Sequence, residues 1–221
     1  MTFVKRFYNK KKKVYRKKRY YKRKVNKLAI KNSPFPRFAI VKMRYATTVR
    51  LNANVTGSSS HLFRANSIAD PDLTGIGHQP YGHDTYASVY NHYKVLKSRI
   101  ICTYTSNGSS SSGNYVVGVA LKDDNNVETD FDTIREARTA KYKIVNDENI
   151  STVTNGYNAR KMFPNNVDNL NAQFSNNPSE DAIFQVFHTS CNSGVEPNSC
   201  DVVVTIEYTV KMWELKDLGQ S

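Results

Sequence analysis

Two groups of imidazole and thiol side chains are the residues best suited to chemistry, because histidine nitrogen and cysteine thiolate are common zinc ligands. They are His78, His83 and His92, and His188, Cys191 and Cys200. Neither spacing matches a standard zinc site. We therefore expect no metal and no cofactor, and interpret these residues as satisfied polar histidines and small buried cysteines. Pairing of Cys191 with Cys200 on oxidation stays open.

The common catalytic motifs do not occur in the sequence. It contains no Walker loop, dinucleotide fingerprint, HExxH helix or nucleophile elbow. Gly75 and Gly77 are close together, but Pro80 interrupts the strand-to-helix arrangement that would aim backbone N–H groups at a phosphate, so we predict a turn. We expect that the protein is not an enzyme. The remaining enzymatic alternative is a small β-barrel hydrolase with carboxylates at Asp123, Asp124 or Asp130.

The N-terminal segment has the composition of a polyanion-binding arm. Residues 5–27 contain 14 basic residues and show no apolar periodicity, so we expect a disordered or extended arm in the free chain. A phosphate backbone would relieve the repulsion between its charges, and tyrosines between the charges can stack on unpaired bases. The predicted nucleic-acid contacts in the arm are Lys10, Lys11, Lys12, Lys13, Tyr15, Arg16, Lys17, Lys18, Arg19, Tyr20, Tyr21, Lys22, Arg23 and Lys24.

The charge of the chain is divided between two parts of opposite sign. Residues 1–50 hold 19 of the 32 Lys and Arg residues and no Asp or Glu, whereas 13 basic and 19 acidic residues leave the remainder at −6. Such a division indicates separate tasks for a cationic arm and a folded body. Pro34 and Pro36 disfavour a helix between them. We therefore predict an arm over residues 1–36 and a body over residues 37–221.

The body is predicted to be all-β. Residues 41–52 and 202–212 alternate between apolar and polar side chains, which is the period-two pattern of half-buried strands. Shorter strands are predicted over residues 60–67, 97–106, 114–122, 139–146, 150–162 and 181–190. About eight strands with long first and last members favour an eight-stranded jelly-roll β-sandwich with a few short helices in loops.

Short helices and polar loops are expected between the strands. We predict a helix over residues 84–94 with Asp84 as its cap, another after Phe163 with Pro164 in its first turn, and a helical turn over 130–137. The serine- and asparagine-rich residues 106–114 and the polar residues 123–126 are predicted loops. Three tyrosines at helical spacing are expected to pack on the body or on a neighbouring subunit. They are Tyr86, Tyr90 and Tyr93.

The polar side of the first predicted strand carries a second group of cations. If this side faces the end from which the arm emerges, it extends the cationic surface onto the body. The residues concerned are Lys42, Arg44 and Arg50. No run of about 18 apolar residues is present, and no apolar region follows the N-terminal charges, so we expect neither a membrane span nor a secretory signal.

Residues 74–95, TGIGHQPYGHDTYASVYNHYKV, resemble a segment of the capsid proteins of circovirus-like viruses, whose genome is circular single-stranded DNA. The basic, tyrosine-containing N-terminus and the β-rich remainder are similar to that family in layout. The family's arm is typically richer in arginine, whereas lysine dominates here. Lysine still acts as a point charge on phosphate.

The resemblance implies a virion protein that forms an icosahedral T=1 shell of about sixty identical jelly-roll subunits. It also implies that the arm binds the single-stranded DNA genome and mediates import into the host nucleus, and that the shell meets a host attachment receptor. The alternative is a cellular nucleic-acid-binding protein, of ribosomal or chromatin type, with a basic tail and no shell. The acidic body argues against that alternative. Ribosomal proteins are surrounded by RNA and usually have basic bodies, whereas residues 51–221 carry a net charge of −6.

Overall fold

The computed structural model describes residues 34–53, 58–107, 114–165, 168–191 and 196–217. Residues 1–33 of the predicted arm, with all of its predicted nucleic-acid contacts from Lys10 to Lys24, lie outside these residues. The same holds for most of the predicted loop at 106–114. The arm and its boundary at residue 36 therefore stay predictions.

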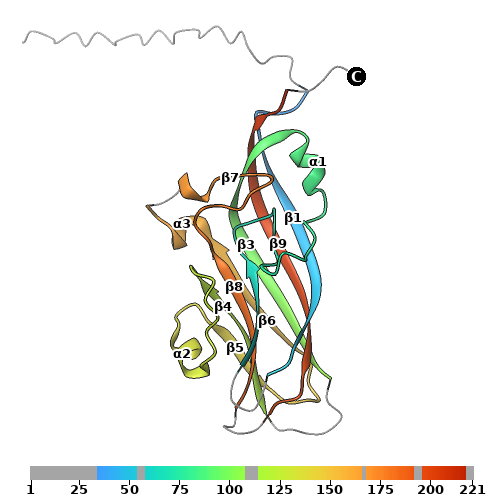
Figure 1. Ribbon diagram of the computed structural model, residues 1–221, viewed down its shortest axis with the longest axis vertical. Helices are drawn as coiled ribbons and strands as arrows, with labels where there is room; N and C mark the ends of the chain where they lie inside the picture. Colours follow the sequence, from blue (N-terminus) through green and yellow to red (C-terminus); the bar gives the residue numbers. More distant parts are fainter. Residues whose placement is uncertain (1–33, 54–57, 108–113, 166–167, 192–195, 218–221) are drawn as a thin grey trace, which may run out of the picture. The chain divides into compact units, whose positions relative to one another are not determined.

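Two antiparallel sheets form the body (Figure 1). The first has the order β1 (Phe38–Leu51), β9 (Cys200–Leu215), β3 (Tyr90–Ser106) and β6 (Ser151–Asn158), with the short β7 (Ala172–Gln173) also paired to β3. The second has the order β2 (Ser58–Arg64), β8 (Ile183–Ser190), β4 (Tyr115–Lys122) and β5 (Lys141–Val145). Apart from the β4–β5 and β6–β7 connections, consecutive strands lie in opposite sheets. This arrangement is a jelly roll and confirms the predicted fold class.

The core lies between the two sheets and follows from the side-chain pattern of the strands. In β1, Met43 and Tyr45 are buried while Lys42 and Arg44 are exposed, as period-two alternation requires. Seven successive residues of β8, from Ile183 to Thr189, are buried, because this strand is central in its sheet and covered on both faces. Burial on both faces explains why buried residues are continuous along β8, whereas buried and exposed residues alternate along much of β1.

Buried tyrosines join the layers through their hydroxyl groups. The Tyr104 hydroxyl donates to the Gly118 carbonyl oxygen at 2.7 Å, and the Tyr208 hydroxyl donates to the Arg64 carbonyl oxygen at 2.8 Å. Each bond connects the first sheet to the second. A buried phenol needs such a partner, because an unpaired polar group in the core is costly.

The helices are short, and the first corrects a prediction. α1 (His83–Ala87) has five residues instead of the predicted 84–94, and its cap is Gly82, with a positive φ of 85°, rather than Asp84. β3 begins at Tyr90. The chain becomes extended there because Tyr90 and Tyr93 insert into the core, where both are at most 2% exposed.

The second correction concerns the helix expected after Pro164. α3 (Ala159–Met162) precedes that proline, capped by the Asn158 side chain, which accepts from the Arg160 N–H at 3.1 Å. A proline disfavours helical backbone in the residue before it, so the helix ends ahead of Phe163. A 3-10 turn follows as η1 (Asp168–Leu170). The predicted turn over 130–137 is present as α2 (Phe131–Glu136), capped by Asp130.

The three cysteines are free thiols: Cys102 and Cys200 are buried and Cys191 is exposed. Burial raises the pKa of Cys102 and of Cys200 to about 12, so both are protonated and unreactive near neutral pH. Within the described ranges, no three His, Cys, Asp or Glu side chains are grouped to hold a metal ion. In the same part of the chain, no helix is long and apolar enough to cross a membrane.

Candidate nucleic-acid interface

The outer face of the first sheet carries a group of exposed cations on the edge strand β1 and on the central strands β9 and β3. β1, β9 and β3 are paired in register, so residues directly opposite one another share a face. One row across the strands is Arg44, Glu207 and Arg99, and the next is Lys42, Thr209 and Lys97. A third row is Ile40, Lys211 and Lys94. We call the five exposed cations Lys42, Arg44, Lys97, Arg99 and Lys211 the cationic face.

An irregularity in β3 brings two of these cations to the surface. The pairing of β3 with β9 shifts between Val95 and Lys97, where β3 contains one extra residue. Before the shift Lys94 lies opposite Lys211, and after it Lys97 lies opposite Thr209. A strand without the extra residue would turn Lys97 and Arg99 toward the core, because one residue of slip reverses the two faces.

The acidic groups on this face neutralise only part of the charge. Arg44 Nη2 lies 2.8 Å from Glu207 Oε1, with exposed side-chain fractions of 69% and 42%. Glu207 also lies opposite Arg99, so among the described residues of these three rows one carboxylate stands among the five exposed cations. A hollow of about 560 Å³ lies here, lined by Lys42, Arg44, Lys97, Arg99 and Glu207 together with neighbouring backbone and side chains.

Lys94 is a further cation on this side of the sheet, but it is buried. Its side chain faces the same side as Lys211 but is only 7% exposed. Burial lowers the pKa of the Lys94 ammonium, Asp168 opposes this effect, and Lys211 lowers the pKa further. Two lysines opposite each other repel, and an approaching anion would relieve that repulsion.

An aromatic row closes the face at the Phe38 end. Phe38, Trp213 and His92 are directly opposite one another on β1, β9 and β3. The His92 and Trp213 rings are stacked, with centroids 5.9 Å apart and an interplanar angle of 17°. Lys211 Nζ lies 5.7 Å from the Phe38 centroid and 5.9 Å from the Trp213 centroid. We call Phe38, Trp213 and His92 the aromatic row.

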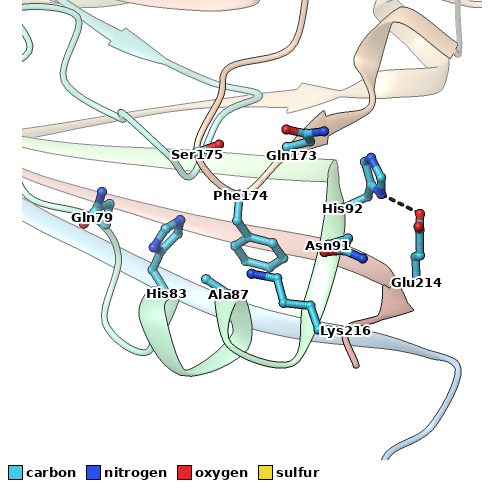
Figure 2. A pocket seen from close by; sticks show the side chains of 10 residues that line it. All are labelled: Gln79, His83, Ala87, Asn91, His92, Gln173, Phe174, Ser175, Glu214 and Lys216. Carbon is cyan, nitrogen blue, oxygen red and sulfur yellow. Dashed lines mark ion pairs between the residues drawn. The ribbon is translucent and has the colours of Figure 1, made fainter. Parts of the chain in front are cut away.

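A pocket of about 550 Å³ opens beside this row (Figure 2). His92 lines it and is held by an ion pair of 2.8 Å from its Nδ1 to Glu214 Oε2. Figure 2 shows His92 and Glu214 on one side and His83 and Gln79 on the other. The lining also includes Phe174, whose ring meets that of His83 edge-on at 5.4 Å. Imidazole and amide side chains give the pocket hydrogen-bond donors and acceptors.

Two of the three cations predicted on the first strand belong to the cationic face. Lys42 and Arg44 do, whereas Arg50 lies further along the strand, 3.9 Å from Asp201, and donates to the Ser199 hydroxyl at 3.3 Å. Asp201 thus offsets the charge of Arg50. Sequence reasoning missed Lys97, Arg99 and Lys211, because their positions on this face depend on strand pairing and on the irregularity in β3. The charged residues that alternate with apolar ones in 205–211 were the available signal.

The histidines considered as zinc ligands in the sequence lie apart from one another and make packing contacts. His78 contacts the Tyr45 ring at a centroid distance of 4.7 Å, and His92 stacks on Trp213. His188 is fully buried beside Tyr115, in an edge-on ring contact at 5.0 Å. These histidines contribute packing on separate parts of the body, as aromatic rings do in a β-sandwich.

Comparison with solved structures identifies relatives of the fold. The structure of Macrobrachium rosenbergii nodavirus matches with a TM-score of 0.51 and 14% identity, over 94% of this chain and 62% of that chain. The decameric BFDV capsid protein matches with a TM-score of 0.49 and 11% identity, over 80% and 100% of the chains. Cocksfoot mottle virus matches with a TM-score of 0.46 and 14% identity, over 80% and 94%.

No family model matches the sequence. The search of curated proteins likewise gives no match. At an identity of 14%, the likeness to the nodavirus structure shows the fold, a two-sheet jelly roll.

Proposed function

We propose that the chain is a viral coat protein that assembles into an icosahedral shell and packages single-stranded DNA. In this proposal residues 1–36 and the cationic face bind the genome, and the rest of the body contacts identical subunits. The protein has no catalytic role. The observation that carries the proposal is the cationic face: five exposed cations stand with one carboxylate on a body whose residues 51–221 carry a net −6.

The charge distribution supports a nucleic acid as the bound polyanion. A strand of phosphates gains binding free energy from each lysine or arginine that replaces a condensed counterion. The arm supplies 14 such charges between residues 5 and 27, and β1, which follows it in the sequence, supplies Lys42 and Arg44. Single-stranded DNA in particular follows from the resemblance of residues 74–95 to circovirus-like capsid proteins.

Exposed apolar side chains support contacts between subunits. Ile76 and Tyr81, in the loop before α1, are 89% and 95% exposed. On the second sheet, the edge strand β5 exposes Ile144 at 63%. We assign these side chains to contacts between subunits, since apolar surface that gathers into patches marks interaction sites. The jelly-roll architecture and the family resemblance support a T=1 shell.

The test compares the full chain with a variant lacking residues 1–36, by electron microscopy and by absorbance at 260 and 280 nm. We expect uniform shells with bound nucleic acid from the full chain, and empty or altered assemblies from the variant. A full chain that stays monomeric in the presence of nucleic acid would overturn the proposal and favour a cellular nucleic-acid-binding protein without a shell.

Two further partners belong to the proposal. The lysine- and arginine-rich arm has the composition of a nuclear-import signal, and a shell protein exposes a surface to a host attachment receptor. Residues 1–36 fused to a fluorescent protein should accumulate in the nucleus. Accumulation that is equal for a fusion with Lys10 to Lys13 and Arg16 to Arg19 replaced by alanine would contradict an import role for the arm.

A further inference from the structure

The aromatic row lies where the cationic face ends, and its rings are at least partly exposed. Phe38 is 56% exposed, and Trp213 is half-buried. Ile40, which follows Phe38 on the same face, is also 56% exposed. The three rings belong to residues directly opposite one another on adjacent strands, next to five cations.

We propose that the aromatic row is a base-stacking platform, on which unpaired bases of the packaged strand lie while the cationic face holds the adjoining phosphates. This inference rests on the proposed function and specifies the chemistry of its ligand. Bases of a duplex are already stacked inside the helix, whereas bases of a single strand are free to meet a ring. The platform therefore selects single-stranded nucleic acid, independently of the family resemblance.

Lys211 is the residue that connects the two kinds of contact. Its ammonium now lies near the Phe38 and Trp213 rings, in a position that a stacked base would take. A cation–π contact at an exposed site is weaker than base stacking. We expect the base to displace the ammonium from the rings and the ammonium to pair with the phosphate of the same nucleotide. The exchange keeps Lys211 partnered in both states.

The spacing of the rows suits an extended strand. Successive rows on one face of the sheet are two residues apart, which is roughly 6.8 Å. This step is close to the separation of successive phosphates in an extended single strand. A nucleic acid that stacks a base on Trp213 would thus place following phosphates near Lys42 and Lys97, and then near Arg44 and Arg99.

His92 fixes the platform in place. Its ring stacks on Trp213, and the ion pair with Glu214 orients the imidazole. Gln173 of β7 lies opposite His92, and both residues line the pocket of Figure 2, so the row ends at this pocket. A flipped base has room beside the rings there.

Trp213 is the only tryptophan in the sequence, so its fluorescence reports on this site alone. The experiment adds a single-stranded oligodeoxythymidylate to the full chain and follows the tryptophan emission. Inorganic polyphosphate, which has the charges but no bases, and a duplex of the same length are the controls. We expect a loss of emission with the single strand and little change with polyphosphate or duplex at equal saturation of binding.

Three outcomes would overturn the inference. They are equal quenching by polyphosphate, unchanged emission when co-sedimentation shows that the single strand is bound, and shielding of Trp213 from acrylamide in shells free of nucleic acid. The last outcome would assign the rings to a contact between subunits. Filled shells with unquenched Trp213 would refute the platform and leave the proposed function standing.

A variant test complements the fluorescence. Phe38→Leu keeps an apolar side chain and removes one ring, and it leaves Trp213 as reporter. Measured in enough salt to weaken the arm's contribution, it should bind single strands about fivefold more weakly and leave duplex affinity unchanged. Tyr142→Leu, which removes a 40% exposed ring from β5 on the other sheet, is the matched control. Equal effects of the two variants would contradict the platform.

Discussion

Arg44 on β1 and Glu207 on β9 form an ion pair of 2.8 Å across two neighbouring strands, and Arg99 lies opposite the same glutamate on β3. One carboxylate therefore stands between two guanidinium groups on the cationic face. Both members of the pair are well exposed, so its contribution to stability is small. Its main effect is on the field that a polyanion meets.

Replacing Glu207 by glutamine should strengthen binding of single-stranded DNA. The change removes the negative charge that opposes Arg44 and Arg99, and the affinity should rise about threefold at low salt. The gain should vanish near 1 M salt, where charges are screened within about 3 Å. Glu136→Gln in α2 alters net charge equally and is the matched control. An equal gain from both variants would indicate a general charge effect.

Removing cations from β3 should lower the salt dependence of binding. Each lost phosphate contact reduces the slope of log K against log salt by about 0.7 for single strands. The double variant Lys97→Ala, Arg99→Ala should therefore lose roughly 1.4 from the slope. Lys141→Ala, Lys143→Ala, which removes two exposed cations from β5, should leave it unchanged. A slope identical to that of the unaltered chain would show that β3 does not touch the phosphates.

Gly118 is a position at which the core tolerates no side chain. A Cβ atom there would clash with the Phe187 ring and would lie 2.6 Å from the Lys141 carbonyl oxygen. Because backbone blocks the space, Gly118→Ala should lower the free energy of unfolding by about 2 kcal/mol. Gly156→Ala is the control, because its Cβ would meet Ser98 O at an ordinary 3.5 Å. Urea midpoints should separate the two variants, and equal midpoints would contradict this packing.

The fold could be predicted from the sequence where alternation was regular. The patterns at 41–52 and 202–212 correspond to β1 and β9, and the strand predicted at 181–190 contains β8. The helix over 84–94 was wrong beyond Ala87, because Tyr86, Tyr90 and Tyr93 have helical spacing. Tyr86 belongs to α1, whereas Tyr90 and Tyr93 belong to β3, so the spacing spans two elements.

The candidate site could be predicted only in part. Lys42 and Arg44 could be found because they alternate with core residues within one strand. Lys97 and Arg99 could not, since the extra residue between Val95 and Lys97 decides which face they take. The aromatic row depends on the pairing of three strands far apart in sequence, and local periodicity does not reveal which distant strands pair.

His188 predicts how stability depends on pH. It is fully buried, neither ring nitrogen has a hydrogen-bond partner among the described residues, and burial lowers its pKa to about 4, against a smaller opposing effect of Asp147. An unfolded histidine titrates near 6.5. As the pH falls below about 6.5, the unfolded chain binds a proton at His188, whereas the folded chain does not bind this proton until the pH is about 4. Stability should fall across this window, by about 3 kcal/mol in total.

The measurement is urea unfolding of the unaltered chain and of His188→Leu between pH 7 and about 5, which covers most of this window and leaves most carboxylates ionised. The leucine variant binds no proton, so its free energy of unfolding should change much less over the same window. His61→Leu is not a suitable control, because His61 contacts Asp72. His78→Leu, at an exposed histidine, should keep the full pH dependence. A pH dependence that is unchanged in His188→Leu would show that His188 stays accessible to protons in the folded protein.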